Sequence, residues 1–137
     1  MAHIIGLGGV FIKYKNPKDM TKWYSEVLGI TTNDYGVLFE FGGENTRKGY
    51  LQLSPFESNS DYFGKPEQKA MLNFRVDDLI EFSKLLKTKN VILVDEIETY
   101  SYGKFLHIED PEGNRIQLWE PVDKVFEEGK EAVTLMR

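Results

Sequence analysis

The feature that most constrains the fold of this chain is an internal repeat with a period of about 65 residues. Tyr35-Gly36 recurs as Tyr102-Gly103, and residues 49–53 (Gly-Tyr-Leu-Gln-Leu) resemble residues 114–118 (Asn-Arg-Ile-Gln-Leu). This period is too long for a solenoid repeat and fits a duplicated half-domain. Each half is therefore expected to supply the same set of strands and helix.

The first half contains signals for a strand and a capped helix. Residues 7–14 predict a strand. Asn16 is an N-cap candidate, Pro17 suits the first helical position, and Gly29 follows the expected end of the helix. The apolar residues of this helix recur at helical spacing and are expected to face a sheet; they are Met20, Trp23, Tyr24, Val27 and Leu28.

The second half repeats this order. Residues 71–76 predict a strand, Asp77-Asp78 predicts a helix start, and Asn90 is a plausible helix stop. The apolar stripe of this helix comprises Leu79, Phe82, Leu85 and Leu86. Further strands are expected at residues 37–41 and 50–53 in the first half, and at 91–98, 104–109 and 115–119 in the second.

Two successive βαβββ units predict an α+β fold in which a curled mixed sheet surrounds a cavity. At 137 residues the chain is expected to form a single domain, with half-units at about 5–54 and 70–121. Residues 55–69 read as the linker, where Tyr62-Phe63 could close over a pocket, and residues 122–137 read as a charged tail with a short helix.

Composition excludes several classes of function. The chain has no cysteine, which removes disulfides, thiolate nucleophiles and cysteine metal sites. A formal charge of −5 without a dense Lys/Arg block argues against binding to nucleic acid or to anionic lipid. No apolar run reaches the length of a membrane span, and the first residues do not resemble a signal peptide, so a cytoplasmic protein is expected.

Strand alternation predicts which side chains face the cavity. Leu106, Ile108, Ile116 and Leu118 share the helix-facing side, so the residues between them face the opposite side. The 67-residue offset makes Glu40 the first-half counterpart of His107, and the two are expected to project into the cavity from opposite sides. They are the candidate catalytic residues, as general base and general acid, while a purely structural role for His107 stays open. The expected ligand-binding residues are Gln52, Gln117, Asn73, Arg75, Phe11, Phe105, Trp119, Met71 and Leu38.

Two motifs resemble a known family. Trp23-Tyr24 followed by Leu28-Gly29, together with the run Asp-Pro-Glu-Gly-Asn at 110–114, resembles the vicinal oxygen chelate superfamily. This group includes glyoxalase I, extradiol dioxygenases, fosfomycin and bleomycin resistance proteins and methylmalonyl-CoA epimerase. The resemblance covers residues 5–121, and it implies the duplicated fold and a homodimer.

The resemblance also implies where a metal would bind, because metal-dependent members carry one ligand on the first strand and one on the last strand of each unit. These positions fall at about Gly9 and Met71 on the first strands, and on Gln52 and Gln117 on the last strands. None of the four is the imidazole or carboxylate that such metals prefer. We therefore expect no metal and no other cofactor.

Three hypotheses for function follow. The first is a metal-free protein of the bleomycin-resistance type that binds or sequesters an aromatic or amphipathic small molecule. The second is a glyoxalase-like lyase or isomerase that uses Glu40 and His107, or a metal at displaced ligands, rather than a dioxygenase. The third is a non-catalytic interaction module, since a fold of this kind does not fix its function.

Overall fold

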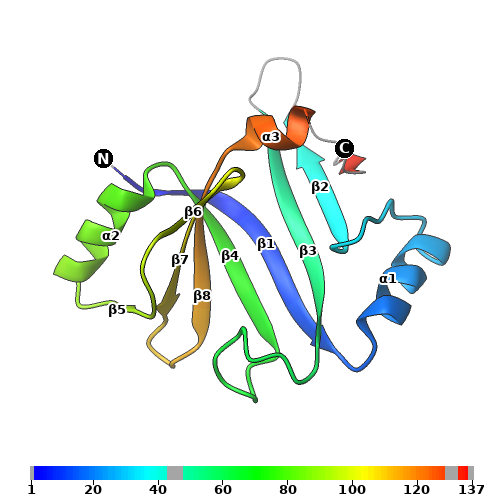
Figure 1. Cartoon of the computed structure of the whole chain (residues 1–137), viewed down its shortest axis with the longest axis horizontal. Helices are drawn as coiled ribbons and strands as arrows, with labels where there is room; N and C mark the ends of the chain where they lie inside the picture. The colour runs from blue at the N-terminus through cyan, green and yellow to red at the C-terminus, as the bar shows by residue number, and fades with distance from the viewer. Residues whose placement is uncertain (1, 43–47, 129–132, 136–137) are drawn as a thin grey trace.

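A computed structural model describes residues 2–42, 48–128 and 133–135, which form a nine-stranded mixed sheet with three helices (Figure 1). The strand order is β5-β7-β8-β4-β1-β3-β2-β9, and β6 also pairs with β7. In chain order the elements are β1 (Ile4–Tyr14), α1 (Pro17–Glu26), β2 (Val37–Phe41), β3 (Gly49–Glu57), β4 (Ala70–Val76), α2 (Leu79–Thr88), β5 (Ile92–Leu93), β6 (Glu98–Tyr100), β7 (Gly103–Glu109), β8 (Arg115–Pro121), α3 (Asp123–Glu128) and β9 (Thr134–Leu135).

The two halves meet along their first strands, which confirms the predicted duplicated α+β fold. β1 pairs antiparallel with β4, and each of these strands pairs in parallel with the last strand of its own half, β3 or β8. The expected strand at 91–98 is divided into β5 and β6, whereas the first-half segment between α1 and β2 contains only an isolated bridge between Asn33 and Gly36. One continuous sheet within one chain therefore holds both units, with α1 and α2 at its opposite ends (Figure 1).

The strand register does not agree with the 67-residue offset between the two halves. Leu38 pairs with Gln52, and His107 pairs with Gln117. If the two glutamines are equivalent, the counterpart of His107 is Leu38 rather than Glu40, and the offset of 67 residues does not hold along these strands. The two Tyr-Gly pairs gave the wrong offset because their glycines are required for local steric reasons. A Cβ at Gly36 would overlap the Leu53 carbonyl, and a Cβ at Gly103 would overlap the Glu120 carbonyl.

The sequence signals for the starts and ends of both helices are confirmed. The Asn16 side chain accepts a hydrogen bond from the backbone N–H of Asp19, and Asp78 does the same for Glu81, so both predicted N-caps are present. Gly29 and Asn90 adopt positive φ values of 71° and 60° just past the ends of α1 and α2.

The two helices bury very different amounts of their apolar stripes. On α2, Leu79 and Leu86 are buried and join the core under the helix. On α1 no residue is buried, and the expectation that its whole stripe faces a sheet is wrong: Trp23, Val27 and Leu28 are exposed, with Val27 at 62%. Helical periodicity detects an apolar face but does not tell how much of that face a sheet covers, since both helices have ten residues.

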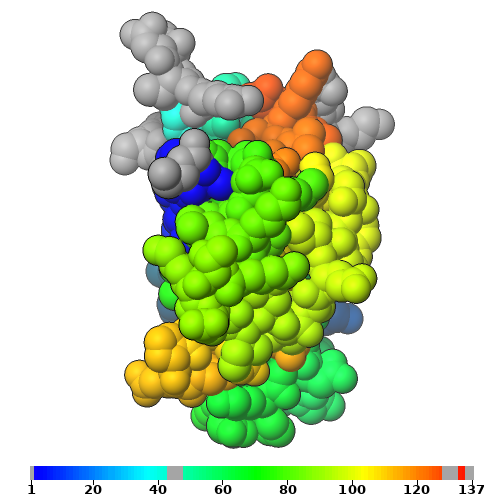
Figure 2. Space-filling model, turned by 90° about the vertical axis from the view of Figure 1, so that its left-hand side faces the viewer, coloured from blue at the N-terminus to red at the C-terminus, as the bar shows by residue number. Residues whose placement is uncertain are grey.

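The main core lies between α2 and the second-half strands. Val76, Leu106 and Leu118 pack against the helix there, with partly buried rings and branched side chains around them. Figure 2 shows this side of the molecule, where α2 and the residues that follow it cover the strands. A smaller cluster of Phe11, Phe63 and Met71 lies where the linker returns to the sheet.

The tail forms α3 and the short strand β9, which pairs with β2. Residues 129–132 and 136–137 lie outside the described part of the chain. No helix within the described part is long and apolar enough to cross a membrane.

Candidate functional site

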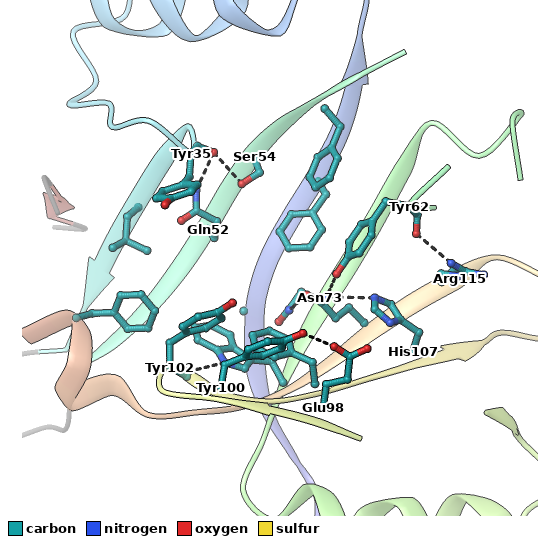
Figure 3. A pocket seen from close by; sticks show the side chains of 18 of the residues that line it. Tyr35, Gln52, Ser54, Tyr62, Asn73, Glu98, Tyr100, Tyr102, His107 and Arg115 are labelled. Atoms are coloured by element: carbon teal, nitrogen blue, oxygen red, sulfur yellow. Dashed lines mark hydrogen bonds between the residues drawn. The ribbon is translucent and has the colours of Figure 1, made fainter. Parts of the chain in front are cut away.

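The concave face of the sheet holds a cavity of about 780 Å³ that both halves line (Figure 3). Its wall includes residues of β1, β2 and β3 from the first half and β4, β7 and β8 from the second. Val125 and Phe126 of α3 contribute to it, as do Tyr100 of β6 and Tyr102 just after that strand. Nine of the residues that line the cavity are aromatic: Phe11, Tyr35, Phe56, Tyr62, Tyr100, Tyr102, Phe105, Trp119 and Phe126.

Most of the sequence-predicted site residues line this cavity. They come from four central strands and two neighbouring ones, as alternation along each strand predicted. They are Phe11, Leu38, Gln52, Asn73, Phe105, His107, Gln117 and Trp119.

Three predicted residues do not line it. The carboxylate of Glu40 accepts a hydrogen bond from the Tyr50 hydroxyl at 2.8 Å, away from His107. The guanidinium of Arg75 is buried against the carboxylate of Asp123 and also donates to the Tyr50 carbonyl. Met71 is 1% exposed and belongs to the smaller core cluster. Each of these side chains contacts other residues, and strand alternation alone does not predict those contacts.

A chain of polar side chains crosses the second-half wall of the cavity. Nδ1 of His107 lies 2.7 Å from one carboxylate oxygen of Asp95. The other carboxylate oxygen accepts a hydrogen bond from the backbone N–H of His107. Nε2 of His107 lies 3.1 Å from the amide nitrogen of Gln117, and the Gln117 oxygen accepts from Asn73 at 2.5 Å. The structure thus pairs His107 with Asp95 where the sequence suggested Glu40.

Tyr62 closes this chain from the linker. Its hydroxyl accepts a hydrogen bond from the Gln117 amide at 2.6 Å, and its ring meets the His107 ring edge-on. Burial raises the pKa of Tyr62 above its ordinary value of 10.0, and the nearby carboxylates of Asp95 and Glu98 act in the same direction. The hydroxyl therefore keeps its proton at neutral pH.

Gln52 has a different role from Gln117, although the two were predicted to act together. Its amide nitrogen lies within hydrogen-bonding distance of the carbonyl oxygens of Tyr35, Val37 and Leu53. These bonds tie Gln52 to the first-half backbone, so it helps to shape the wall rather than joining a side-chain network. Both glutamines line the same cavity.

Stacked rings form the wall beside the polar chain. The Tyr100 and Tyr102 rings are parallel with centroids 5.3 Å apart, and Phe105 stacks on Trp119 at 5.9 Å. Phe126 of α3 meets Trp119 edge-on, and the Trp119 indole N–H donates to the Tyr102 carbonyl. A flat apolar surface is therefore held in a fixed orientation.

Several residues of the site were not predicted. Asp95 lies between β5 and β6 in a segment expected to be one strand, and Phe126 lies in the tail, where no function was expected. Tyr62 was the exception, since an aromatic pair in a polar linker did point to a residue that could close over a pocket.

The sequence of residues 6–118 matches the family model described as the Glyoxalase/Bleomycin resistance protein/Dioxygenase superfamily. The match spans most of the chain and includes both units of the repeat. The chain belongs to this superfamily. Membership of the glyoxalase superfamily accounts for the duplicated sheet and the concave cavity, whereas function depends on the side chains that line it.

Solved structures with this fold include methylmalonyl-CoA epimerases. The Mycobacterium tuberculosis enzyme is 22% identical, covers 90% of this chain and 93% of its own, and superposes with a TM-score of 0.61. A Streptomyces coelicolor variant in complex with 2-nitronate-propionyl-CoA is 14% identical, with coverage of 88% and 99% and a TM-score of 0.64.

A third similar structure is described as an NAD-dependent benzaldehyde dehydrogenase from Legionella pneumophila. It is 15% identical, with coverage of 82% of this chain and 97% of its own and a TM-score of 0.54. At these identities the likeness extends to the glyoxalase fold alone. A search of curated proteins gave no significant match.

The donor set of the cavity does not fit the metal that many superfamily members bind. Strand register places Gly9 beside Gln52 and Asn73 beside Gln117, so the second-half counterpart of Gly9 is Asn73 rather than Met71. These positions offer one glycine and three neutral amides, which supply neither the donor strength nor the charge that a divalent transition metal needs. Among the described residues, no three His, Cys, Asp or Glu side chains converge as a metal site.

Proposed function

We propose that this protein binds an aromatic or amphipathic small molecule in its concave cavity without a metal. The observation that carries the proposal is the set of solvent-accessible rings inside the cavity wall. Tyr35, Tyr62, Tyr100 and Tyr102 are 67%, 38%, 44% and 40% exposed, although all of them line the cavity. Such exposed apolar surface in a concave site of this volume is typical of a ligand pocket.

The hydrogen bonds of the His107 ring favour ligand binding over catalysis. Its Nδ1 is engaged by Asp95, and its Nε2 is engaged by Gln117. A general base must present a free lone pair to its substrate. Because both ring nitrogens already have partners, the imidazole is better suited to hold the wall of the cavity than to take a proton from a ligand.

The two tryptophans offer a direct test, because Trp119 lines the cavity at 4% exposure and Trp23 lies on α1 at 46% exposure. The Trp23→Phe variant reports only on the cavity, and Trp119→Phe reports only on α1. Titration with a panel of aromatic compounds should change the fluorescence of Trp23→Phe and leave that of Trp119→Phe unchanged. A response of neither variant to any compound, or equal responses of both, would count against the proposed cavity site.

A second candidate function is proton transfer of the lyase or isomerase kind, which the Asp95–His107 pair favours. A carboxylate on Nδ1 orients an imidazole in many acid–base sites, and Gln117 would have to release Nε2 when substrate enters. Turnover of a 2-oxoaldehyde adduct that is lost in His107→Ala would support this candidate. Unchanged turnover in that variant would remove His107 from the mechanism.

The exposed face of α1 supports a proposal that two copies of the chain associate. Trp23, Val27 and Leu28 leave an apolar patch on the surface of the described structure. Patches of this kind mark association surfaces when they are contiguous. Sedimentation velocity should show a dimer that the Leu28→Glu variant shifts toward monomer, and a wild-type protein that stays monomeric at all concentrations would contradict the proposal.

A further inference from the structure

One atom in the cavity wall lacks a hydrogen-bond partner. Asn73 is 2% exposed, and its Oδ1 is a buried side-chain atom with no partner among the described residues. Asn73 lines the cavity beside Gly8, and a Cβ at Gly8 would overlap Oδ1, so the glycine leaves room for this oxygen. A buried acceptor left unpaired is costly, which points to a missing donor.

The direction of the polar chain explains why an oxygen, rather than an N–H, is left over. Asp95 is an acceptor, so His107 carries its proton on Nδ1 and offers the lone pair of Nε2 to the Gln117 amide. The Gln117 oxygen then takes an N–H from Asn73. The Asp95 carboxylate thereby sets the orientation of both amides and leaves the Asn73 oxygen unpaired.

The other end of the same network offers a donor. The Tyr62 hydroxyl already accepts from the Gln117 amide, so its own hydrogen remains available to an acceptor in the cavity. Asn73 and Tyr62, both labelled in Figure 3, each bond to the Gln117 side chain. Asn73 thus carries an unpaired acceptor and Tyr62 an available donor.

We infer that the cavity selects an uncharged aromatic compound with a secondary or primary amide, or a lactam, whose N–H is accepted by Asn73 Oδ1. The amide carbonyl of the ligand is the acceptor for Tyr62, and its ring lies against the aromatic wall around Trp119. This inference rests on the proposed function and adds the class of ligand. An aromatic carboxylate is disfavoured, because it has no hydrogen to donate to Asn73 Oδ1 and because two carboxylates, Asp95 and Glu98, line the described cavity wall against one cation, Arg115.

A matched pair of probe compounds tests whether the cavity recognises the N–H of the ligand. N-methyl-2-naphthamide and methyl 2-naphthoate have nearly the same size and shape, but the amide has an N–H where the ester has an oxygen. Isothermal titration calorimetry should show the amide binding at least about tenfold more tightly than the ester. The anion 2-naphthoate should bind more weakly than both.

Variants test whether Asn73 causes the preference for the amide over the ester. In Asn73→Leu the acceptor is gone, and the amide and ester should bind with equal affinity. The matched control Asn59→Leu, in the exposed linker, should keep the wild-type preference. If Asn73→Leu does not fold, Asn73→Ala serves instead, because it also removes Oδ1 and should abolish the preference.

The possible outcomes separate the inference from the proposed function. Equal binding of amide and ester to wild type would overturn the inference and leave the aromatic cavity site standing. A preference that persists in Asn73→Leu would also overturn it, because the donor would then be recognised elsewhere. If none of the three probes binds, the proposed function itself is contradicted.

Discussion

The two halves of the molecule share a backbone plan but differ in what they bury and what they offer to a ligand. In the second half, α2 covers a continuous core and the cavity wall carries a side-chain network from Asp95 to Asn73. In the first half, α1 has no buried residue, and Gln52 is bound to backbone carbonyls. The two halves thus share a strand order, while the second half holds both the larger core and the side-chain network.

α3 connects the two halves across the end of the cavity. Its Asp123 pairs with Arg75 of the second half, and its Phe126 contacts both Tyr50 of the first half and Trp119 of the second. The C-terminal tail therefore completes a cavity wall that neither repeat closes by itself.

The largest effect should come from truncating the buried face of α2. Leu79→Ala removes a side chain that is fully buried in the core and should lower the free energy of unfolding by about 3 kcal/mol. Leu28→Ala, just past the C-terminal end of α1, removes an exposed side chain and should cost less than about 1 kcal/mol in dilute solution. Urea denaturation measures both, and equal costs would show that the two helices are equally packed.

Loss of the α3 anchor should have the next largest effect. Asp123→Ala leaves the buried guanidinium of Arg75 without its carboxylate and should lower the free energy of unfolding by about 2 kcal/mol. Glu127→Ala on the exposed side of α3 is the matched control and should have little effect. If the control and Asp123→Ala unfold at the same urea concentration, α3 does not hold the halves together.

A smaller effect should distinguish the carboxylate that contacts His107 from the one that was expected there. Asp95→Asn leaves one oxygen for two N–H donors of His107 and should cost about 1 kcal/mol of unfolding free energy. Glu40→Gln keeps an oxygen for the Tyr50 hydroxyl and should change stability by less than about 0.5 kcal/mol. Thermal denaturation of the two variants provides the measurement, and the reverse order would restore Glu40 as the partner.

The smallest effect should appear at alkaline pH. Burial and the Tyr14 hydroxyl raise the pKa of Tyr24 to about 12, and burial raises that of Tyr62 above 10.0. Because these folded-state values exceed the unfolded value, the stability they contribute is complete below pH 10 and is lost as pH rises through the folded pKa. Ultraviolet absorbance should show delayed tyrosinate formation in the folded protein, and Tyr24→Phe should weaken the pH dependence. A stability that rises above pH 10 would contradict this sign.

Much of the fold was predictable because its signals are local. Asn16, Asp78, Gly29 and Asn90 each satisfy backbone requirements within a few residues, so the helix ends could be read from the sequence. Alternation along strands also placed side chains such as His107 and Trp119 on the concave face correctly.

The partners across the cavity could not be predicted, because they depend on register between distant strands. A shift of two residues keeps the same face of the strand and moves a side chain by one pair, which is how Glu40 was matched to His107 in place of Leu38. The contacts of Arg75 with Asp123 and of Tyr62 with Gln117 join residues about fifty positions apart, and no local pattern signals them.

The most direct test of the ligand site is an X-ray structure of the protein crystallised with N-methyl-2-naphthamide. We expect electron density for the naphthyl ring against Trp119 in the cavity, with the amide N–H within hydrogen-bonding distance of Asn73 Oδ1. A cavity that is filled by its own side chains, or a probe bound only outside it, would contradict the account.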